Sequence, residues 1–285
     1  EFNFLSELKA YAEGLGLYFF SAPMGKESLS TLIKLDCDLI KISSYEVTNL
    51  PWIREVAKTK KPIIMSCGGS NISEVERALD QIYAYHDNVA LMHCVIKYPA
   101  QIEDSNLKIM STLRSAFELP IGFSNNGFIN NEIIDYKEIP FSASALGMDL
   151  YEIHITLDRE MDGVDQGFST EPKELKDMMT IIADTRNDFL ESKDLLIKDK
   201  YLGSGIKKTL DCEKYVRDFA YKSIFTTRVI EKGEKLDDSN IKCLRPGEYR
   251  SGLEPMYFDL ACQKFYAKDK IEAYDPIVWD NITTK

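Results

Sequence analysis

The chain has 285 residues and a net charge of −11, because 46 acidic residues outnumber 35 basic ones. This acidity argues against nucleic acid or an anionic membrane as the main partner. No apolar run approaches the roughly 18 residues that a membrane span requires, so we predict no membrane partner either. The length is sufficient for one large domain or two smaller ones.

Residues 1–13 have the pattern of a helix with a polar face, and they lack the basic start and apolar centre of a signal peptide. The six cysteines include no pair at CxxC spacing, which argues against a zinc knuckle or a redox dithiol. Three of them lie in apolar, strand-like runs, where buried free thiols are expected. We therefore predict a reducing, cytoplasmic location, or a chain whose true N-terminus is absent from this sequence.

Six short apolar segments follow in chain order, each with the composition of a strand buried on both faces. They are residues 17–23, 38–44, 62–67, 89–95, 120–125 and 149–157. Helical patterns lie between them, as in 71–86, where the apolar residues fall on one face. This alternation predicts a parallel sheet with right-handed crossovers.

Polar side chains crowd the C-terminal ends of these predicted strands, and no glycine-rich phosphate loop follows the first of them. A site built from many strand ends is typical of a (β/α)8 barrel, whereas a dinucleotide fold would need the glycine-rich loop. The chain also opens on a helix that leads into a strand. We therefore predict an α/β fold, a TIM (β/α)8-type barrel that lacks its first two βα units.

A change of character from Tyr215 onward predicts a second domain. Residues 171–190 have the pattern of a closing helix with Pro172 near its first turn. We assign 1–191 to the barrel portion, the charged, glycine-containing 192–212 to a linker, and 213–285 to a small β-rich domain. About 70 residues are enough for a separate domain of this kind.

Several motifs occur in an order that resembles the sialic acid (N-acetylneuraminate) synthase family. KISSYEVTNLP at 41–51 is similar to the family pattern KIASGEITNLP, and KPIIMSCG at 61–68 is similar to KPVILSTG. GFSNNG at 122–127 is similar to GYSDHT, and EIHITLDR at 152–159 is similar to EKHFTLDR. VIEKGEKL at 229–236, followed by LRPG at 244–247, resembles the antifreeze-like (SAF) domain. The resemblance therefore spans nearly the whole chain.

The resemblance implies a PEP-dependent transferase that forms C–C bonds in carbohydrate and surface polysaccharide biosynthesis. Such an enzyme condenses phosphoenolpyruvate with an N-acylated amino sugar, such as N-acetylmannosamine, to give a nine-carbon keto sugar acid and phosphate. The enol carbon attacks the aldehyde carbon, water adds at C2 of PEP, and phosphate leaves. This chemistry needs a cationic phosphate cradle, an electrophile on the aldehyde oxygen and acid–base groups.

Candidate PEP ligands follow from these motifs. Lys41 is the candidate phosphate ligand, because a lysine at a barrel strand end is a compact charge held where field lines focus. The alternative is a surface lysine that extends its charge to solvent. The resemblance assigns Ser66 and Ser124 to the phosphate and Ser44 to the carboxylate. Considered alone, each would be an ordinary strand-end serine.

The resemblance also implies groups that act on the sugar. It makes Glu46 and Asp165 the acid–base catalysts and places Tyr98 against the sugar. Otherwise Glu46 would be a helix N-terminal carboxylate and Tyr98 a packed loop aromatic. Arg245 matches an antifreeze-domain arginine that reaches the site of a partner subunit, which implies a domain-swapped homodimer. Otherwise Arg245 would be an ordinary turn residue.

A metal site is implied by His154, which matches one of two family histidines that hold a divalent ion, typically Mn²⁺, on the aldehyde oxygen. A lone strand histidine is otherwise a hydrogen-bonded core residue, as we expect for His93. Asn126 replaces the second histidine, and its amide oxygen would ligate Mn²⁺ or Mg²⁺ more weakly than imidazole. We expect His154 and Asn126 to share one weakly held ion, and Lys41, Ser66 and Ser124 to converge on one anion site.

Further departures from the family patterns leave three hypotheses open. The departures are Ala22, Tyr45, Ile96, Ile153 and Gln166, which replace Thr, Gly, Asn, Lys and His. The chain is an active nonulosonic acid synthase, a divergent homologue that binds sugar or PEP without turnover, or an interaction protein that uses the antifreeze-like domain. The acceptor sugar is also open, with sialic, legionaminic, pseudaminic and spore-coat types as candidates.

Overall fold

The computed structural model describes residues 2–130 and 133–284, and the chain divides into two compact units. Unit 1 comprises Glu1–Ile63, Ser73–Asn88 and Tyr215–Lys285, and unit 2 comprises Ile64–Ile72 and Val89–Lys214. This division reflects packing, so the domain limits predicted at 191 and 212 stay a prediction.

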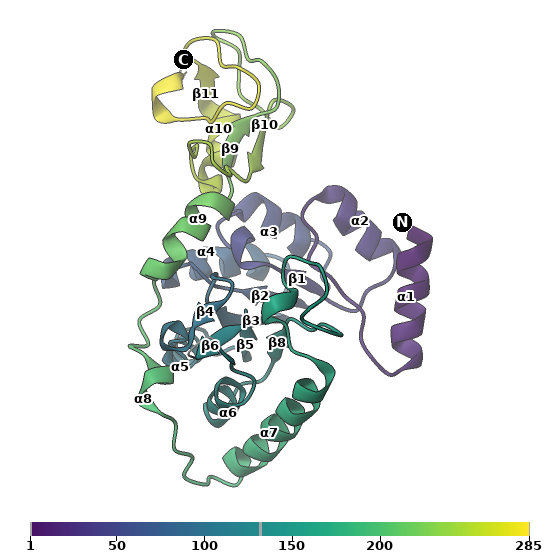
Figure 1. The fold of residues 1–285 in the computed structure, drawn as a ribbon. Helices are drawn as coiled ribbons and strands as arrows, with labels where there is room; N and C mark the ends of the chain where they lie inside the picture. Colours follow the sequence, from purple (N-terminus) through teal and green to yellow (C-terminus); the bar gives the residue numbers. More distant parts are fainter. Residues whose placement is uncertain (1, 131–132, 285) are drawn as a thin grey trace. The chain divides into compact units, whose positions relative to one another are not determined.

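The main sheet has the strand order β1–β2–β3–β5–β8, and its larger part lies in unit 2 (Figure 1). The strands of this larger part are β2 (Ile63–Ser66), β3 (Val89–Cys94), β5 (Ile121–Asn125) and β8 (Tyr151–Ile153). β3, β5 and β8 pair in parallel, with Cys94 opposite Ser124 and Ser124 opposite Glu152. The predicted parallel α/β fold is therefore confirmed, whereas completion of a barrel stays a prediction.

Helices and a small second sheet complete unit 2. The helices are α5 (Lys108–Phe117), α6 (Glu138–Ala145), α7 (Pro172–Leu190) and α8 (Asp199–Leu202). β4 (Ala100–Gln101) pairs with β6 (Phe128–Asn130), which pairs with β7 (Ile133–Ile134). The predicted closing helix at 171–190 is confirmed as α7, which begins at Pro172. A proline suits the first turn of a helix because backbone N–H groups there have no partner within the helix, and proline has no N–H.

Unit 1 contains β1 (Ile40–Ile42), the short 3-10 helix η1 (Ser44–Glu46) and the helices α1 (Phe2–Gly14), α2 (Lys26–Lys34), α3 (Leu50–Ala57) and α4 (Ile72–Tyr83). The predicted apolar stripe of α4 is confirmed, because Val75, Ala78, Leu79 and Ile82 are buried. The strand predicted at 17–23 is not formed. Among the described residues this segment has one backbone bond to β1, from Lys41 N to Ser21 O, and a ladder needs successive bonds.

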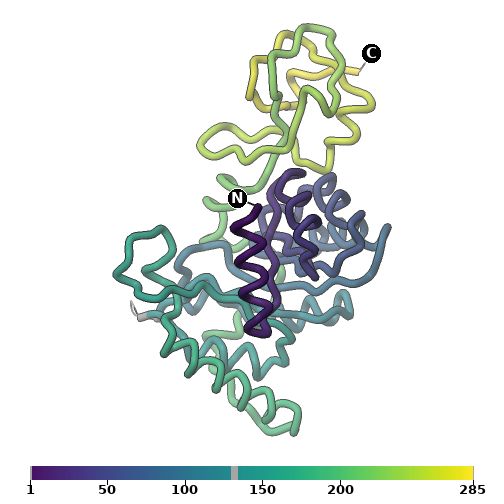
Figure 2. Tube along the Cα trace, turned by 90° about the vertical axis from the view of Figure 1, so that its right-hand side faces the viewer, coloured from purple at the N-terminus to yellow at the C-terminus, as the bar shows by residue number. Residues whose placement is uncertain are grey.

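The C-terminal part of unit 1 has a hydrophobic core of its own, and its trace turns back on itself repeatedly (Figure 2). After α9 (Lys214–Ala220), β9 (Ser223–Thr226) pairs antiparallel with β10 (Ile241–Leu244), and β11 (Phe265–Ala267) pairs antiparallel with β12 (Ile282–Thr284). α10 (Phe258–Lys264) precedes β11. Ile224, Ile241 and Ile277 are fully buried in this core. The predicted β-rich character is confirmed, and the antifreeze-like assignment stays a prediction.

Two further findings bear on the sequence predictions. No helix in the described ranges is long and apolar enough to cross a bilayer. The six cysteines, all within the described ranges, form no disulfide, and Cys37, Cys67 and Cys94 are buried, as expected for thiols in apolar runs. Burial raises the pKa of the Cys243 thiol to about 12, so it stays protonated at neutral pH.

Candidate functional site

In unit 1 the candidate residues lie on β1 and η1. Lys41 and Ser44 are 9% and 5% exposed, which places an ammonium group and a hydroxyl in a largely dry environment. Lys41 occupies a strand whose three residues are all buried. The alternative of a surface lysine that extends its charge to solvent therefore does not apply to it. A charge in such a place interacts more strongly with an anion than it would in water.

Glu46 is the most deeply buried of the candidate acids, at 1% exposure, and both of its oxygens have a close neighbour. Asn49 donates a hydrogen bond from Nδ2 to Oε2 at 2.7 Å. Nζ of Lys222 lies 2.7 Å from Oε1, although the angles of this contact are not those of a directed hydrogen bond. The Coulomb attraction does not depend on that angle, so the pair offsets part of the desolvation of both charges.

Arg245 is brought to the same turn of unit 1. Its guanidinium carbon lies 4.8 Å from the ring centre of Tyr45, and the ring of Tyr221 contacts Tyr45 edge-on at 6.3 Å. A guanidinium over an aromatic face is favourable even at an exposed site. The predicted sugar-site arginine therefore lies beside residue 45, which precedes the predicted acid–base residue.

In unit 2 two candidate serines lie at strand ends. Ser66 ends β2 and Ser124 lies in β5, and both are 3% exposed. Ser124 Oγ donates a hydrogen bond to Oε1 of Glu152 on the neighbouring strand at 2.6 Å. A hydroxyl has one proton to donate, so a phosphate at Ser124 would compete with Glu152. Because Lys41 belongs to unit 1, its convergence with Ser66 and Ser124 stays a prediction.

An aromatic cluster in unit 2 collects three of the predicted site residues. The rings of Tyr98 and His154 lie 5.9 Å apart, and Phe168 contacts both, at 6.1 and 5.3 Å. Nδ1 of His154 lies 3.7 Å from Oδ2 of Asp165. The His154 and Asp165 side chains are 32% and 51% exposed, so a ligand can reach them. Tyr98, His154 and Asp165 therefore form one accessible group.

The loop after β5 packs against the same cluster. A side chain on Gly127 would meet the Phe168 ring at 2.5 Å, and the positive φ of +76° also favours glycine there. Asn126, which precedes it, is buried and donates from Nδ2 to Val95 O at 2.8 Å. This bond orients the amide, but the sharing of one ion by Asn126 and His154 stays a prediction.

Three residues with a clear structural role were not singled out by the sequence. They are Lys222, Glu152 and Glu213. Lys222 and Glu213 meet partners far earlier in the chain, and no local spacing signals such pairs. Glu152 lies within one of the motifs that resemble the family. An alignment of the two predicted strands would have placed it opposite Ser124 and so indicated the pair.

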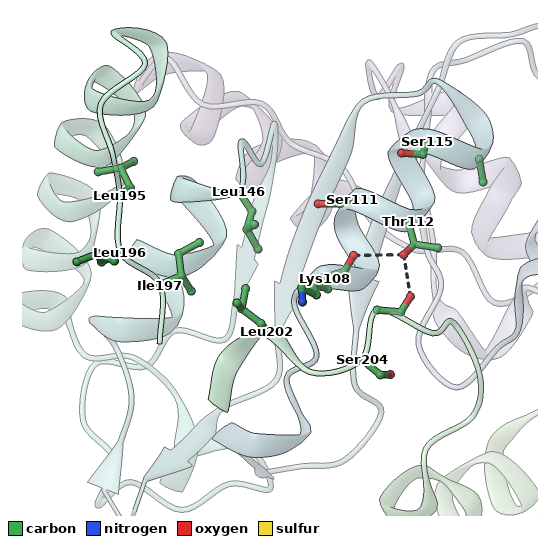
Figure 3. Close-up of a pocket in the computed structure, with 12 residues that line it drawn as sticks. Lys108, Ser111, Thr112, Ser115, Leu146, Leu195, Leu196, Ile197, Leu202 and Ser204 are labelled. Atoms are coloured by element: carbon green, nitrogen blue, oxygen red, sulfur yellow. Dashed lines mark hydrogen bonds between the residues drawn. The ribbon is translucent and has the colours of Figure 1, made fainter. Parts of the chain in front are cut away.

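An open groove of about 940 Å³ lies in unit 2 and is shown in Figure 3. Apolar residues of 195–202 form one side, and Lys108, Ser111, Thr112 and Ser115 of α5 form the other. None of the predicted site residues lines it. The groove is therefore distinct from the strand-end chemistry.

Comparison with known proteins identifies related chains. Residues 2–192 match the family model described as the NeuB family. The chain is 38% identical over 277 residues to the spore coat polysaccharide biosynthesis protein SpsE of Bacillus subtilis, covering 96% of this chain and 73% of that protein. It is 34% identical over 266 residues to the N,N'-diacetyllegionaminic acid synthase of Campylobacter jejuni, covering 92% and 73%. The crystal structure of Bacillus subtilis SpsE superposes with a TM-score of 0.91 at 37% identity, covering 98% and 77%.

Proposed function

This chain belongs to the NeuB family, and we propose that it condenses phosphoenolpyruvate with an N-acylated amino sugar to form a nonulosonic acid and phosphate. The family match over residues 2–192 carries the proposal, because it includes every predicted site residue except Arg245. Relatives named as synthases, such as the legionaminic acid enzyme, support an enzymatic role in carbohydrate biosynthesis.

In this proposal the buried ammonium of Lys41 binds the phosphate of PEP and Ser44 binds its carboxylate. The enol carbon forms a bond to the aldehyde carbon, whose oxygen becomes an alkoxide. Water adds to the cationic C2, and the C2–O bond to phosphate then breaks to leave a ketone. The water loses both of its protons, one to the alkoxide and one to the departing phosphate, so two acid–base groups suffice. Glu46 and Asp165 are our candidates for these transfers.

A divalent ion is part of the proposal, and the residues fit only a weak site. No group of three His, Cys, Asp or Glu side chains that could hold a metal occurs in residues 2–130 and 133–284. The imidazole of His154 would supply one nitrogen and the amide of Asn126 one oxygen, which leaves Asp165 available for proton transfer. Such a set suits Mn²⁺ or Mg²⁺ with water in the remaining positions. When bound, the ion would polarise the aldehyde oxygen.

We also propose a homodimer in which Arg245 serves the site of the partner subunit. In the described chain its guanidinium lies over Tyr45 of the same chain. In a domain-swapped dimer, Arg245 of each subunit would lie over the Tyr45 ring of the other subunit instead. Light scattering on the full-length protein measures the oligomeric state, and a monomer would contradict the swap.

The test of the reaction uses the full-length protein with PEP, Mn²⁺ and a panel of N-acetylated amino sugars. We expect phosphate release with at least one sugar. The mass of the product should equal the masses of PEP, the sugar and water together, minus the mass of phosphoric acid. Lys41→Met should abolish release, while Lys61→Met, which removes a surface lysine paired with Asp36, should not. No release with any sugar would contradict the proposal.

The second candidate is a homologue that binds PEP without turnover. The replacement of the second metal histidine of the family by Asn126 favours it, because an amide binds first-row metals more weakly than imidazole does. Calorimetry would then show PEP binding that Lys41→Met abolishes, with no phosphate release under any condition.

A further inference from the structure

The segment predicted as a linker packs closely against unit 2. Tyr201 is fully buried, and its carbonyl accepts from Leu107 N at 2.9 Å and Ser105 Oγ at 3.1 Å. Gly205 N donates to Oδ1 of Asn106 at 2.8 Å. Buried backbone groups with specific partners at successive positions describe an ordered strap rather than a flexible connection.

The last part of this strap, residues 207–213, will be called the brace. Glu213 lies at its end and is 2% exposed. Its Oε1 accepts from Gly69 N at 2.9 Å and from Ile96 N at 3.1 Å, and its Oε2 accepts from Leu210 N at 2.8 Å. Charge-assisted bonds to three backbone donors hold a carboxylate in one orientation. One side chain therefore ties together two loops that belong to different strands.

Two other brace residues bind the first of these loops. Lys207, 8% exposed, donates from Nζ to Ser70 O, and Thr209 Oγ1 donates to Gly69 O at 2.7 Å. Both the N–H and the C=O of Gly69 are thus bound to the brace. This fixes the turn at Gly69, whose φ of +66° is in the region that favours glycine.

The two bound loops are those that carry site residues. Gly69 follows Ser66 at the end of β2, and Ile96 precedes Tyr98 after β3. They also pack tightly on each other, because a side chain on Gly68 would meet Cys94 Sγ at 2.5 Å and Ile96 Cγ2 at 2.7 Å. Small displacements of such loops alter reacting geometry strongly.

We propose that Glu213 is a positioning residue that fixes the loops of Ser66 and Tyr98, so that the brace is part of the support of the substrate site. This inference rests on the proposed function for its effect on turnover. Its effect on the loops rests on the hydrogen bonds alone.

The test compares Glu213→Ala with Thr112→Val in the full-length protein. Alanine removes both carboxylate oxygens, so Gly69 N, Ile96 N and Leu210 N all lose this acceptor. Thr112→Val removes another anchor of the same strap, the 2.7 Å bond from Thr112 Oγ1 to Gly205 O, which lies away from both loops. Thr209→Val is a milder brace variant that removes a single bond to Gly69.

Two measurements are made on each variant. Hydrogen exchange of the Gly69 and Ile96 amides should be at least tenfold faster in Glu213→Ala, modestly faster at Gly69 in Thr209→Val, and within twofold of wild type in Thr112→Val. The kcat/KM for the amino sugar should fall at least tenfold in Glu213→Ala and stay within twofold in Thr112→Val. If Glu213→Ala fails to fold, the same two measurements on Thr209→Val and Thr112→Val test the proposal.

The outcomes separate the two proposals. Unchanged exchange at Gly69 and Ile96 overturns the brace whatever the activity. Faster exchange with unchanged kcat/KM overturns the positioning role. If wild-type protein shows no turnover, the proposed function fails and the positioning role fails with it, while the exchange data still show whether the brace holds the loops.

Discussion

The turn after β1 in unit 1 and the loops after β2 and β3 in unit 2 each depend on one buried glutamate, held in different ways. Glu46 lies against the ammonium of Lys222 and the amide of Asn49, two side chains. Glu213 accepts from three backbone N–H groups. Side chains can change rotamer and exchange a proton, whereas backbone donors in packed loops cannot. The comparison is consistent with our two proposals, that Glu46 transfers a proton and that Glu213 is a fixed support.

The largest expected effect is that of Glu46→Gln on turnover. If Glu46 transfers a proton, phosphate release should fall by roughly 10²- to 10⁴-fold, the usual contribution of a general acid or base. Steady-state kinetics of the full-length protein measure this, with Glu55→Gln as a control, because Glu55 lies on the surface beside Lys58. If phosphate release falls less than fivefold in Glu46→Gln, Glu46 does not transfer a proton and does not differ in role from Glu213.

Lys222→Met tests the charge pair itself. It leaves the Glu46 carboxylate buried without the ammonium, while Asn49 still donates to it, and breaking a buried pair costs about 3–5 kcal/mol. Urea unfolding should show this loss, and the double variant Lys222→Met with Glu46→Gln should recover part of it. Additive losses in the double variant would mean that the two charges do not interact.

Gly68→Ala probes the packing of the loops in unit 2. The new methyl group would overlap Cys94 Sγ and Ile96 Cγ2, so unfolding free energy should fall by about 1–3 kcal/mol. Gly14→Ala is the control, since a side chain there meets nothing within 4 Å. Equal stability of both variants would show that the loops separate easily.

Asn126→His tests the metal site beside the aromatic cluster. A second imidazole should increase Mn²⁺ affinity about tenfold, which is about 1.4 kcal/mol, because imidazole binds first-row metals better than an amide does. Titration of wild type, Asn126→His and His154→Ala measures it. Equal affinity in all three would remove the metal from the proposal.

The last effect is a dependence of stability on pH that comes from His93, whose pKa responds to the charge of Lys207 in the brace. Burial, reinforced by the charge of Lys207, lowers the pKa of His93 from 6.5 to about 3. Between these values the unfolded chain binds a proton that the folded chain does not, so stability is lost as pH falls below 6.5, by about 1.4 kcal/mol per pH unit. His93→Gln, which can still donate to Ser105 O, should remove this slope in acid unfolding. An unchanged slope would assign it to other groups.

The sequence by itself determined the parallel α/β fold, the helices α4 and α7, the β-rich C-terminal region and the family. These features depend on local periodicity and on motifs that are contiguous in the chain. The segment 17–23 shows the limit, since a strand needs a neighbour that composition does not reveal. The tertiary structure alone decided that Lys222 pairs with Glu46 and that Glu213 ties Gly69 to Ile96. Such pairs join residues distant in sequence, and only the folded backbone brings their polar groups within bonding distance.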